Sequence, residues 1–207
     1  MELYGAEGKP EEGLNTETGV SGGPMNTISG LLLDPTQVTP EDIYLIDIAR
    51  PLSYLCRGVG QCKFFFSVGQ HSIHCAKEAE ARGYSERVQL ACLLHDGGEA
   101  YMNDIIRPVK QHISGFRSLE RQFQRAILTR FGIGDVTEEE WNKVRAIDNA
   151  MLTNEMKALF AGVDDLIPDP LVSTPAIAPR PFEEVEQEFS EMVCSLSSAM
   201  ASPENNV

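Results

Sequence analysis

The residues with the clearest chemical potential are His95 and Asp96, which follow an apolar stretch at 88–94. A neutral imidazole beside a carboxylate offers two metal ligands on adjacent residues. A polar group at the end of a buried helix costs roughly 2–7 kcal/mol unless it is paired or binds a metal. The pair is therefore either a hydrogen-bonded core pair or part of a metal site. His71 and Asp148 favour the metal site, because two imidazoles and two carboxylates suit a divalent transition metal with open positions.

Local sequence signals place these side chains on helices. Ser67 and Gln70 have capping-box spacing, which predicts a helix that starts after Ser67, carries His71 in its first turn and ends near Gly83. Ser85 is a suitable cap for a second helix, which ends at the His-Asp pair. We therefore expect the first imidazole and the His-Asp pair to come from consecutive helices.

A third helix is expected to carry Asp148. Thr137 and Glu140 form a second capping-box pattern, and an apolar stripe continues from there to Phe160. Asp148 lies on the flank of that stripe, in mid-helix. A carboxylate there needs a partner, so a metal or an arginine is the physical expectation.

The remaining segments give weaker signals. A short strand or hairpin edge is expected within 28–35, and a helix from Thr39 to about Arg57 with a kink at Pro51. Residues 103–115 predict a loop or short helix, and 119–131 an amphipathic helix.

Composition and charge bound the function. The 207 residues carry a net charge of −14, but the segment 25–160 is near neutral at −2 and both ends are acidic. That distribution argues against a DNA- or RNA-binding surface. A small anionic ligand stays open, because five cations cluster within 107–125; a solvated helix face explains that cluster equally well. No apolar run approaches the roughly 20 residues that span a bilayer, and the start of the chain lacks the pattern of a secretory signal.

We expect one domain with tails. Residues 1–24 read as a disordered acidic tail, 25–160 as the domain that carries the site, 161–181 as a proline-rich loop, 182–200 as a helix that packs on the domain or on a second subunit, and 201–207 as a disordered tail. Five cysteines without CxxC spacing indicate reduced thiols and a cytoplasmic setting rather than a disulfide framework.

The ordered pattern of His71, then His95 and Asp96, then Asp148 resembles the HD-domain metal-dependent phosphohydrolases, over about 27–160. Five motifs in order look like the branch with bacterial 5′-deoxynucleotidases and viral dATP triphosphohydrolases. These motifs are Ile46-Asp47-Ile48-Ala49, Leu55-Cys56-Arg57, Phe65-Phe66-Ser67-Val68-Gly69-Gln70-His71-Ser72, Leu93-Leu94-His95-Asp96-Gly97-Gly98-Glu99-Ala100-Tyr101 and Asp104-Ile105-Ile106-Arg107-Pro108-Val109-Lys110.

The resemblance implies an all-α fold, an HD-domain helical bundle with at most a short N-terminal β-hairpin. It also implies one catalytic metal, Co²⁺, Mn²⁺, Zn²⁺ or Fe²⁺, held by His71, His95, Asp96 and Asp148. A second ion, Mg²⁺ carried by the substrate phosphates, is compatible with this set.

Further roles follow from the same resemblance. Glu99 is placed to orient or deprotonate the attacking water, and Asp104 to assist that proton transfer or to hydrogen-bond the sugar. Arg57 and Lys110 would hold phosphate oxygens. The glycine-rich loop that follows Arg57 departs from the bulkier residues of relatives, and Lys63 in it adds a cation that would favour extra phosphates.

The implied activity is hydrolysis of deoxynucleoside 5′-phosphates, mono- or triphosphates, with purines such as dATP preferred and an apolar wall at 64–66 for the base. The expected partner is a small-molecule deoxynucleotide, without stable nucleic acid or membrane, in a homo-oligomer (dimer or larger) of the cytoplasm, or of the host cytoplasm if the protein is viral. Two alternatives stay open: a non-catalytic metal- and nucleotide-binding sensor, and an HD hydrolase of a signalling nucleotide such as a guanosine tetraphosphate.

Overall fold

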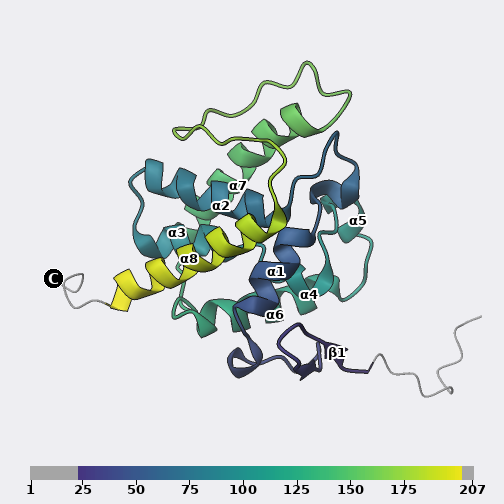
Figure 1. Ribbon diagram of the computed structural model, residues 1–207, viewed down its shortest axis with the longest axis vertical. Helices are drawn as coiled ribbons and strands as arrows, with labels where there is room; N and C mark the ends of the chain where they lie inside the picture. Colours follow the sequence, from purple (N-terminus) through teal and green to yellow (C-terminus); the bar gives the residue numbers. More distant parts are fainter. Residues whose placement is uncertain (1–22, 202–207) are drawn as a thin grey trace, which may run out of the picture.

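The computed structural model describes residues 23–201, and the chain there is all-α apart from one short hairpin (Figure 1). The helices are α1 (Ile46–Tyr54), α2 (Val68–Ala81), α3 (Glu86–Leu94), α4 (Glu99–Met102), α5 (Arg107–Lys110), α6 (Phe116–Arg130), α7 (Glu138–Leu159) and α8 (Phe182–Ala201), with 3-10 turns η1 (Pro40–Asp42) and η2 (Arg57–Gly60). Strands β1 (Met25–Asn26) and β2 (Leu32–Leu33) pair antiparallel. The predicted fold class is confirmed.

The predicted termini extend beyond this range. Most of the expected tail at 1–24 and nearly all of that at 201–207 lie outside the described residues. Within the described range, no helix has the length and apolarity needed to cross a bilayer.

Two capping boxes fix the helices that carry the site. The Ser67 hydroxyl accepts from the Gln70 amide, and the Gln70 side chain accepts from the Ser67 amide, at the start of α2. Thr137 and Glu140 make the same reciprocal pair at the start of α7. Each box satisfies two amides that the first turn of a helix leaves unpaired. Both helix starts match the prediction.

The helix expected from Thr39 to Arg57 is divided in the structure. Thr39 and Asp42 form the expected capping contact, but the turn they cap is only η1. Ile43 then takes an extended backbone (φ −93°, ψ 118°) and is fully buried, and α1 begins three residues later. Burial of the Ile43 side chain therefore outweighs the local preference to continue the helix.

The core lies where α2 and α3 pack against each other and against α1, α7 and α8. In Figure 1, α8 runs diagonally across α1 and α3. Its apolar residues Val185, Phe189 and Val193 are at most 1 % exposed. Burial of side chains of this size contributes about 1.5–3 kcal/mol each. Because this face is covered by the chain itself, an oligomer would have to use another surface.

The segment between α7 and α8 has no helix or strand, yet it is fastened to α2. The carboxylate of Glu78, which is fully buried, accepts hydrogen bonds from the amides of Val172 and Ser173. The Gln70 side chain donates to the carbonyl of Ala178. We call residues 161–181 the strap. These bonds hold it beside the helix that carries His71.

Candidate metal centre and pocket

Four side chains from three parts of the fold converge on one point. His71 lies in the first turn of α2, His95 at the end of α3, Asp96 directly after it, and Asp148 in the middle of α7. The two Nε2 atoms are 3.3 Å apart. The Asp148 Oδ1 lies 3.3 and 3.7 Å from the His71 and His95 Nε2 atoms, and the Asp96 Oδ2 lies 3.7 and 3.3 Å from them. The structure thus brings together the four predicted ligands.

Both imidazoles are held so that Nε2 faces this point. The Nδ1 of His71 lies 2.9 and 3.0 Å from the two carboxylate oxygens of Glu155. The Nδ1 of His95 lies 2.7 Å from the carbonyl oxygen of Cys92. Both partners are acceptors, so each ring carries its proton on Nδ1 and directs the Nε2 lone pair inward. An acceptor behind each ligating imidazole is the usual support of a metal-bound histidine.

The donor set fits a divalent transition metal. Ligands bonded at about 2.1 Å to one ion lie roughly 3.0–3.5 Å from their neighbours, close to the separations in this centre. Two lone pairs that face each other at 3.3 Å repel unless a cation or a proton lies between them. Burial opposes a charged imidazole, but Glu155 and Asp148 help to outweigh it and raise the pKa of His71 well above its ordinary value. The centre therefore favours positive charge.

Cys75 offers a second possible donor set. Its Sγ lies 3.6 Å from the His71 Nε2, and His71, Cys75 and His95 alone could also hold an ion. Burial raises the pKa of the Cys75 thiol to about 11, which favours the neutral thiol. Asp96 and Asp148 reach both Nε2 atoms and also line the adjacent pocket, where a substrate could enter. We therefore prefer the set with two carboxylates.

Glu99 and Asp104, the two predicted acids, lie beside the centre, and each is 7 % exposed. Glu99 begins α4, and its Oε2 has no hydrogen-bond partner among the described residues. Burial, with the charges of Asp96 and Asp104, raises the pKa of Glu99 well above its usual range. Asp104 accepts a hydrogen bond from the amide of Gly58 at 3.2 Å. Glu99 thus has a free oxygen and a raised proton affinity.

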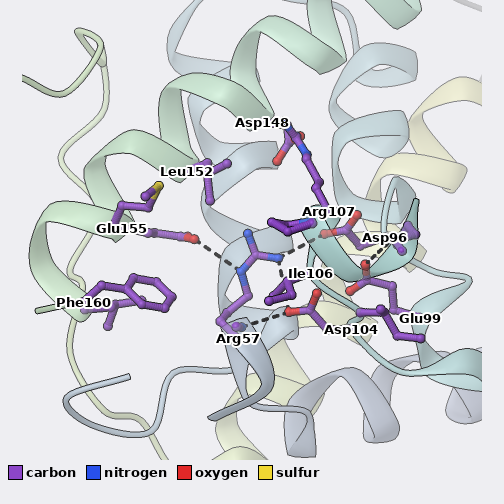
Figure 2. A pocket seen from close by; sticks show the side chains of 16 residues that line it. Arg57, Asp96, Glu99, Asp104, Ile106, Arg107, Asp148, Leu152, Glu155 and Phe160 are labelled. Atoms are coloured by element: carbon purple, nitrogen blue, oxygen red, sulfur yellow. Dashed lines mark hydrogen bonds and ion pairs between the residues drawn. The ribbon is translucent and has the colours of Figure 1, made fainter. Parts of the chain in front are cut away.

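The Arg57 guanidinium is shared among three carboxylates. Its nitrogens lie 3.4 Å from Glu155, 3.5 Å from Asp96 and 3.8 Å from Asp104 (Figure 2). Burial alone would lower the pKa of Arg57, but these acids raise it above its ordinary value. Arg57 lines the pocket, and in this structure it holds carboxylates in place. Its contact with phosphate stays a prediction.

The other cations differ in position. Lys110 lines the pocket and lies 2.6 Å from Glu120 and 3.7 Å from Glu99. Lys63, predicted to contact substrate, is exposed and is not part of the pocket lining; its amide donates to the Leu159 carbonyl. The sequence interpretation did not assign Arg107 to the site. Its guanidinium lies 3.0 Å from the outer oxygen of Asp148 and lines the same pocket.

The pocket next to the four donors has a volume of about 340 Å³, at the lower end of small-molecule sites. Figure 2 shows Asp96 and Glu99 on one side of it and Phe160 on the other. Five acids and three bases line it, so acidic side chains outnumber basic ones. The acids are Asp96, Glu99, Asp104, Asp148 and Glu155, and the bases are Arg57, Arg107 and Lys110.

Glu155 is the second site residue that the sequence interpretation missed. It lies one turn after Met151 and one turn before Leu159, on the predicted apolar stripe of α7, and it is 1 % exposed. A carboxylate on an apolar stripe requires a buried partner, so the signal was present. The sequence could not show that the partners are His71 and Arg57.

Comparison with known proteins gives the family. Fold and site define an all-helical protein with a candidate metal centre beside a small-molecule pocket. The chain is 30% identical over 141 residues to the uncharacterized protein YfdR of Escherichia coli (strain K12), covering 68% of this chain and 74% of YfdR. It is 37% identical over 177 residues to the uncharacterized protein RCAP_rcc00048 of Rhodobacter capsulatus, covering 79% of this chain and 90% of that protein. The chain belongs to the family of these proteins. No family model matches it.

Proposed function

We propose that the protein is a divalent-metal-dependent phosphohydrolase of the HD type that acts on deoxynucleoside 5′-phosphates. The observation that carries the proposal is the convergence of His71, His95, Asp96 and Asp148 within 3.3–3.7 Å at the edge of a pocket that also contains Glu99. The resemblance of the five sequence motifs supplies the substrate class.

The four convergent side chains would hold the ion, Co²⁺, Mn²⁺, Zn²⁺ or Fe²⁺. When bound, such an ion supplies a Lewis acid for a phosphoryl oxygen and lowers the pKa of water. It also changes the charge of the pocket. Acids outnumber bases in the lining, which disfavours a phosphate, and a bound divalent cation would offset that excess. Metal binding is therefore expected to precede nucleotide binding.

Glu99 is the candidate general base. Its buried, unpartnered Oε2 can accept a proton from water, and its raised pKa increases its affinity for that proton. Attack of that water on phosphorus forms one P–O bond and breaks the bond to the nucleoside oxygen, which takes up a proton. A monophosphate then gives nucleoside and phosphate; attack on the α-phosphorus of a triphosphate gives nucleoside and triphosphate.

Asp104 and the cations complete the arrangement. Asp104 is fixed by the Gly58 amide and by Arg57, so it can hydrogen-bond a sugar hydroxyl or pass on a proton. Lys110 and Arg107 line the opening and can turn to phosphate oxygens, exchanging one carboxylate partner for a phosphate.

The test is turnover by metal-stripped protein given back Co²⁺, Mn²⁺, Zn²⁺ or Mg²⁺ with each deoxynucleotide and ribonucleotide, including a guanosine tetraphosphate. We expect metal-dependent release of nucleoside from deoxynucleotides. Glu99→Gln should lower kcat about 10²–10⁴-fold while metal and nucleotide still bind. Glu139→Gln, on the exposed start of α7, is the matched control and should match wild type. Nucleotide binding without turnover, at every metal, would instead indicate a sensor.

A further inference from the structure

The pocket has a second end, formed by the last turns of α7. Its lining there consists of Leu152, Met156, Leu159 and Phe160, none of which offers a side-chain nitrogen or oxygen. Glu155 lies among them, but His71 and Arg57 occupy its carboxylate. Figure 2 shows Phe160 across the pocket from Asp96 and Glu99. The cavity is thus charged at one end and apolar at the other.

The lining follows one face of α7 at helical spacing. Asp148, Leu152 and Met156 are successive turns of the helix, each about 6 Å further from the metal ligand. Phe160 follows the last residue of α7 with an extended backbone (φ −104°, ψ 152°), and it lines the same pocket. A ligand whose phosphate lies at Asp148 therefore places its far end against Met156 and Phe160.

Gly58 keeps the Phe160 ring in this position. Its φ is +58°, in the left-handed region that favours glycine. A Cβ at Gly58 would lie 2.6 Å from the Cζ of Phe160, closer than atoms can approach. The ring occupies the space that the Cβ of any other residue at position 58 would fill. The residue directly after α7 therefore places a bulky side chain against the glycine-rich loop.

We infer that Phe160, with Gly58 behind it, forms a subsite for the nucleobase. The Phe160 ring stacks on the face of the base. This inference rests on the proposed function for the phosphate end. Among the described residues, the apolar end of the lining, Leu152, Met156, Leu159 and Phe160, offers no side-chain group that could hydrogen-bond the edge of a base. Stacking on an aromatic ring accepts every base, because each has a π-face. All four bases bind, and purines bind more tightly because they stack over a larger area.

The experiment compares deoxyadenosine 5′-phosphate with 2-deoxyribose 5-phosphate, which has the same phosphate and sugar but no base. The readout is the ratio of the two kcat/KM values. Phe160→Ala should lower that ratio roughly ten- to hundredfold, the size of one lost base stack, mainly through KM for the nucleotide. Phe160→Tyr should restore it, and Phe160→Leu should not, since leucine keeps apolar volume without a ring. Thermal unfolding of each variant checks that it folds.

Gly58→Ala supplies an independent arm. The added Cβ displaces the ring, so the ratio falls in the same direction as in Phe160→Ala. In the double variant, Gly58→Ala should add little, because the ring that it displaces is gone. Ile167→Ala, on the exposed strap, is the control that leaves the ratio unchanged.

The outcomes separate the subsite from the proposed activity. An unchanged ratio of kcat/KM values in Phe160→Ala overturns the proposed subsite but does not contradict the proposed hydrolase activity. If wild type hydrolyses neither compound, the proposed function fails, and calorimetry with deoxyadenosine 5′-phosphate on metal-loaded protein tests the subsite directly. Binding weakened at least tenfold in Phe160→Ala supports it; equal binding, or none to either protein, overturns it.

Discussion

Two buried histidines on α2 lie one turn apart in opposite surroundings. His71 is fully buried between the Glu155 carboxylate and three other candidate ligands, and its pKa is raised. His74 is 7 % exposed, packs near the Phe66 ring, and its Nδ1 has no partner among the described residues. Burial lowers the pKa of His74 to about 4. Burial therefore dominates at His74, although Glu155 acts on it too, whereas direct contact with Glu155 and Asp148 distinguishes the candidate ligand His71.

The largest expected difference between the two is in metal binding. His71→Asn keeps a donor near the position of Nδ1 for Glu155 but removes Nε2. We expect metal content to fall from about one ion per chain to near zero, and turnover to fall about a thousandfold or more. His74→Phe should keep both. Metal analysis of the purified proteins checks this, and equal metal loss in the two variants would contradict the contrast.

Glu155→Gln tests the acceptor that contacts the Nδ1 of His71, on the opposite side of the ring from the metal centre. The amide oxygen can still accept from the His71 Nδ1, but the negative charge that raises the basicity of the ring and balances Arg57 is lost. We expect metal affinity to fall about 10–100-fold, measured by competition with a chelator.

Glu78→Gln is the matched control, since Glu78 is a buried carboxylate of α2 that binds the strap. It should leave metal affinity unchanged and cost about 1–3 kcal/mol of stability through its lost hydrogen bonds. If Glu78→Gln lowered metal affinity as much as Glu155→Gln, the effect would come from loss of any buried charge near α2 and not from the contact between Glu155 and His71.

His74 predicts a pH dependence of stability. Its folded pKa of about 4 lies below the ordinary value of 6.5, so the unfolded chain takes up a proton first as the pH falls. The stability associated with neutral His74 is present above pH 6.5 and is lost toward pH 4. The full effect is roughly 3 kcal/mol. Denaturant unfolding across this range should show a shallower acid loss in His74→Phe than in wild type; identical slopes would refute the environment assigned to His74.

The smallest expected effects concern Lys110 and Lys63, both of which the sequence interpretation assigned to substrate phosphates. Lys110→Ala should raise KM for a nucleotide about tenfold, as expected for loss of one charged contact. Lys63→Ala should change KM less than about twofold, because Lys63 lies outside the pocket lining. Steady-state kinetics with mono- and triphosphates checks both, and a large Lys63 effect with triphosphates alone would restore its predicted role.

Local signals in the sequence were sufficient for much of the fold and for placing four candidate site residues, His71, His95, Asp96 and Asp148, on or next to their helices. Capping at Ser67 and Thr137 acts over three residues, so it can be read directly, and it placed His71 and Asp148 on the correct helices. The helix predicted from Thr39 failed where burial of Ile43 overrode the local signal.

Contacts distant in sequence were not predictable in the same way. The pairing of Glu155 with His71 spans 84 residues, and the three carboxylates around Arg57 come from different elements. Nothing local to Arg57 distinguishes a guanidinium held by carboxylates from one that is free for phosphate. The packing of Phe160 against Gly58 is of the same kind, because it depends on how two loops meet.

A cobalt titration of metal-free wild type, Asp148→Asn and Cys75→Ser shows whether the four convergent side chains bind a metal. We expect about one Co²⁺ per chain and no thiolate-to-cobalt charge-transfer band, with affinity lowered at least about tenfold in Asp148→Asn and unchanged in Cys75→Ser. Absence of binding to wild type would contradict the account. So would binding that depends on Cys75 and is unaffected by Asp148→Asn.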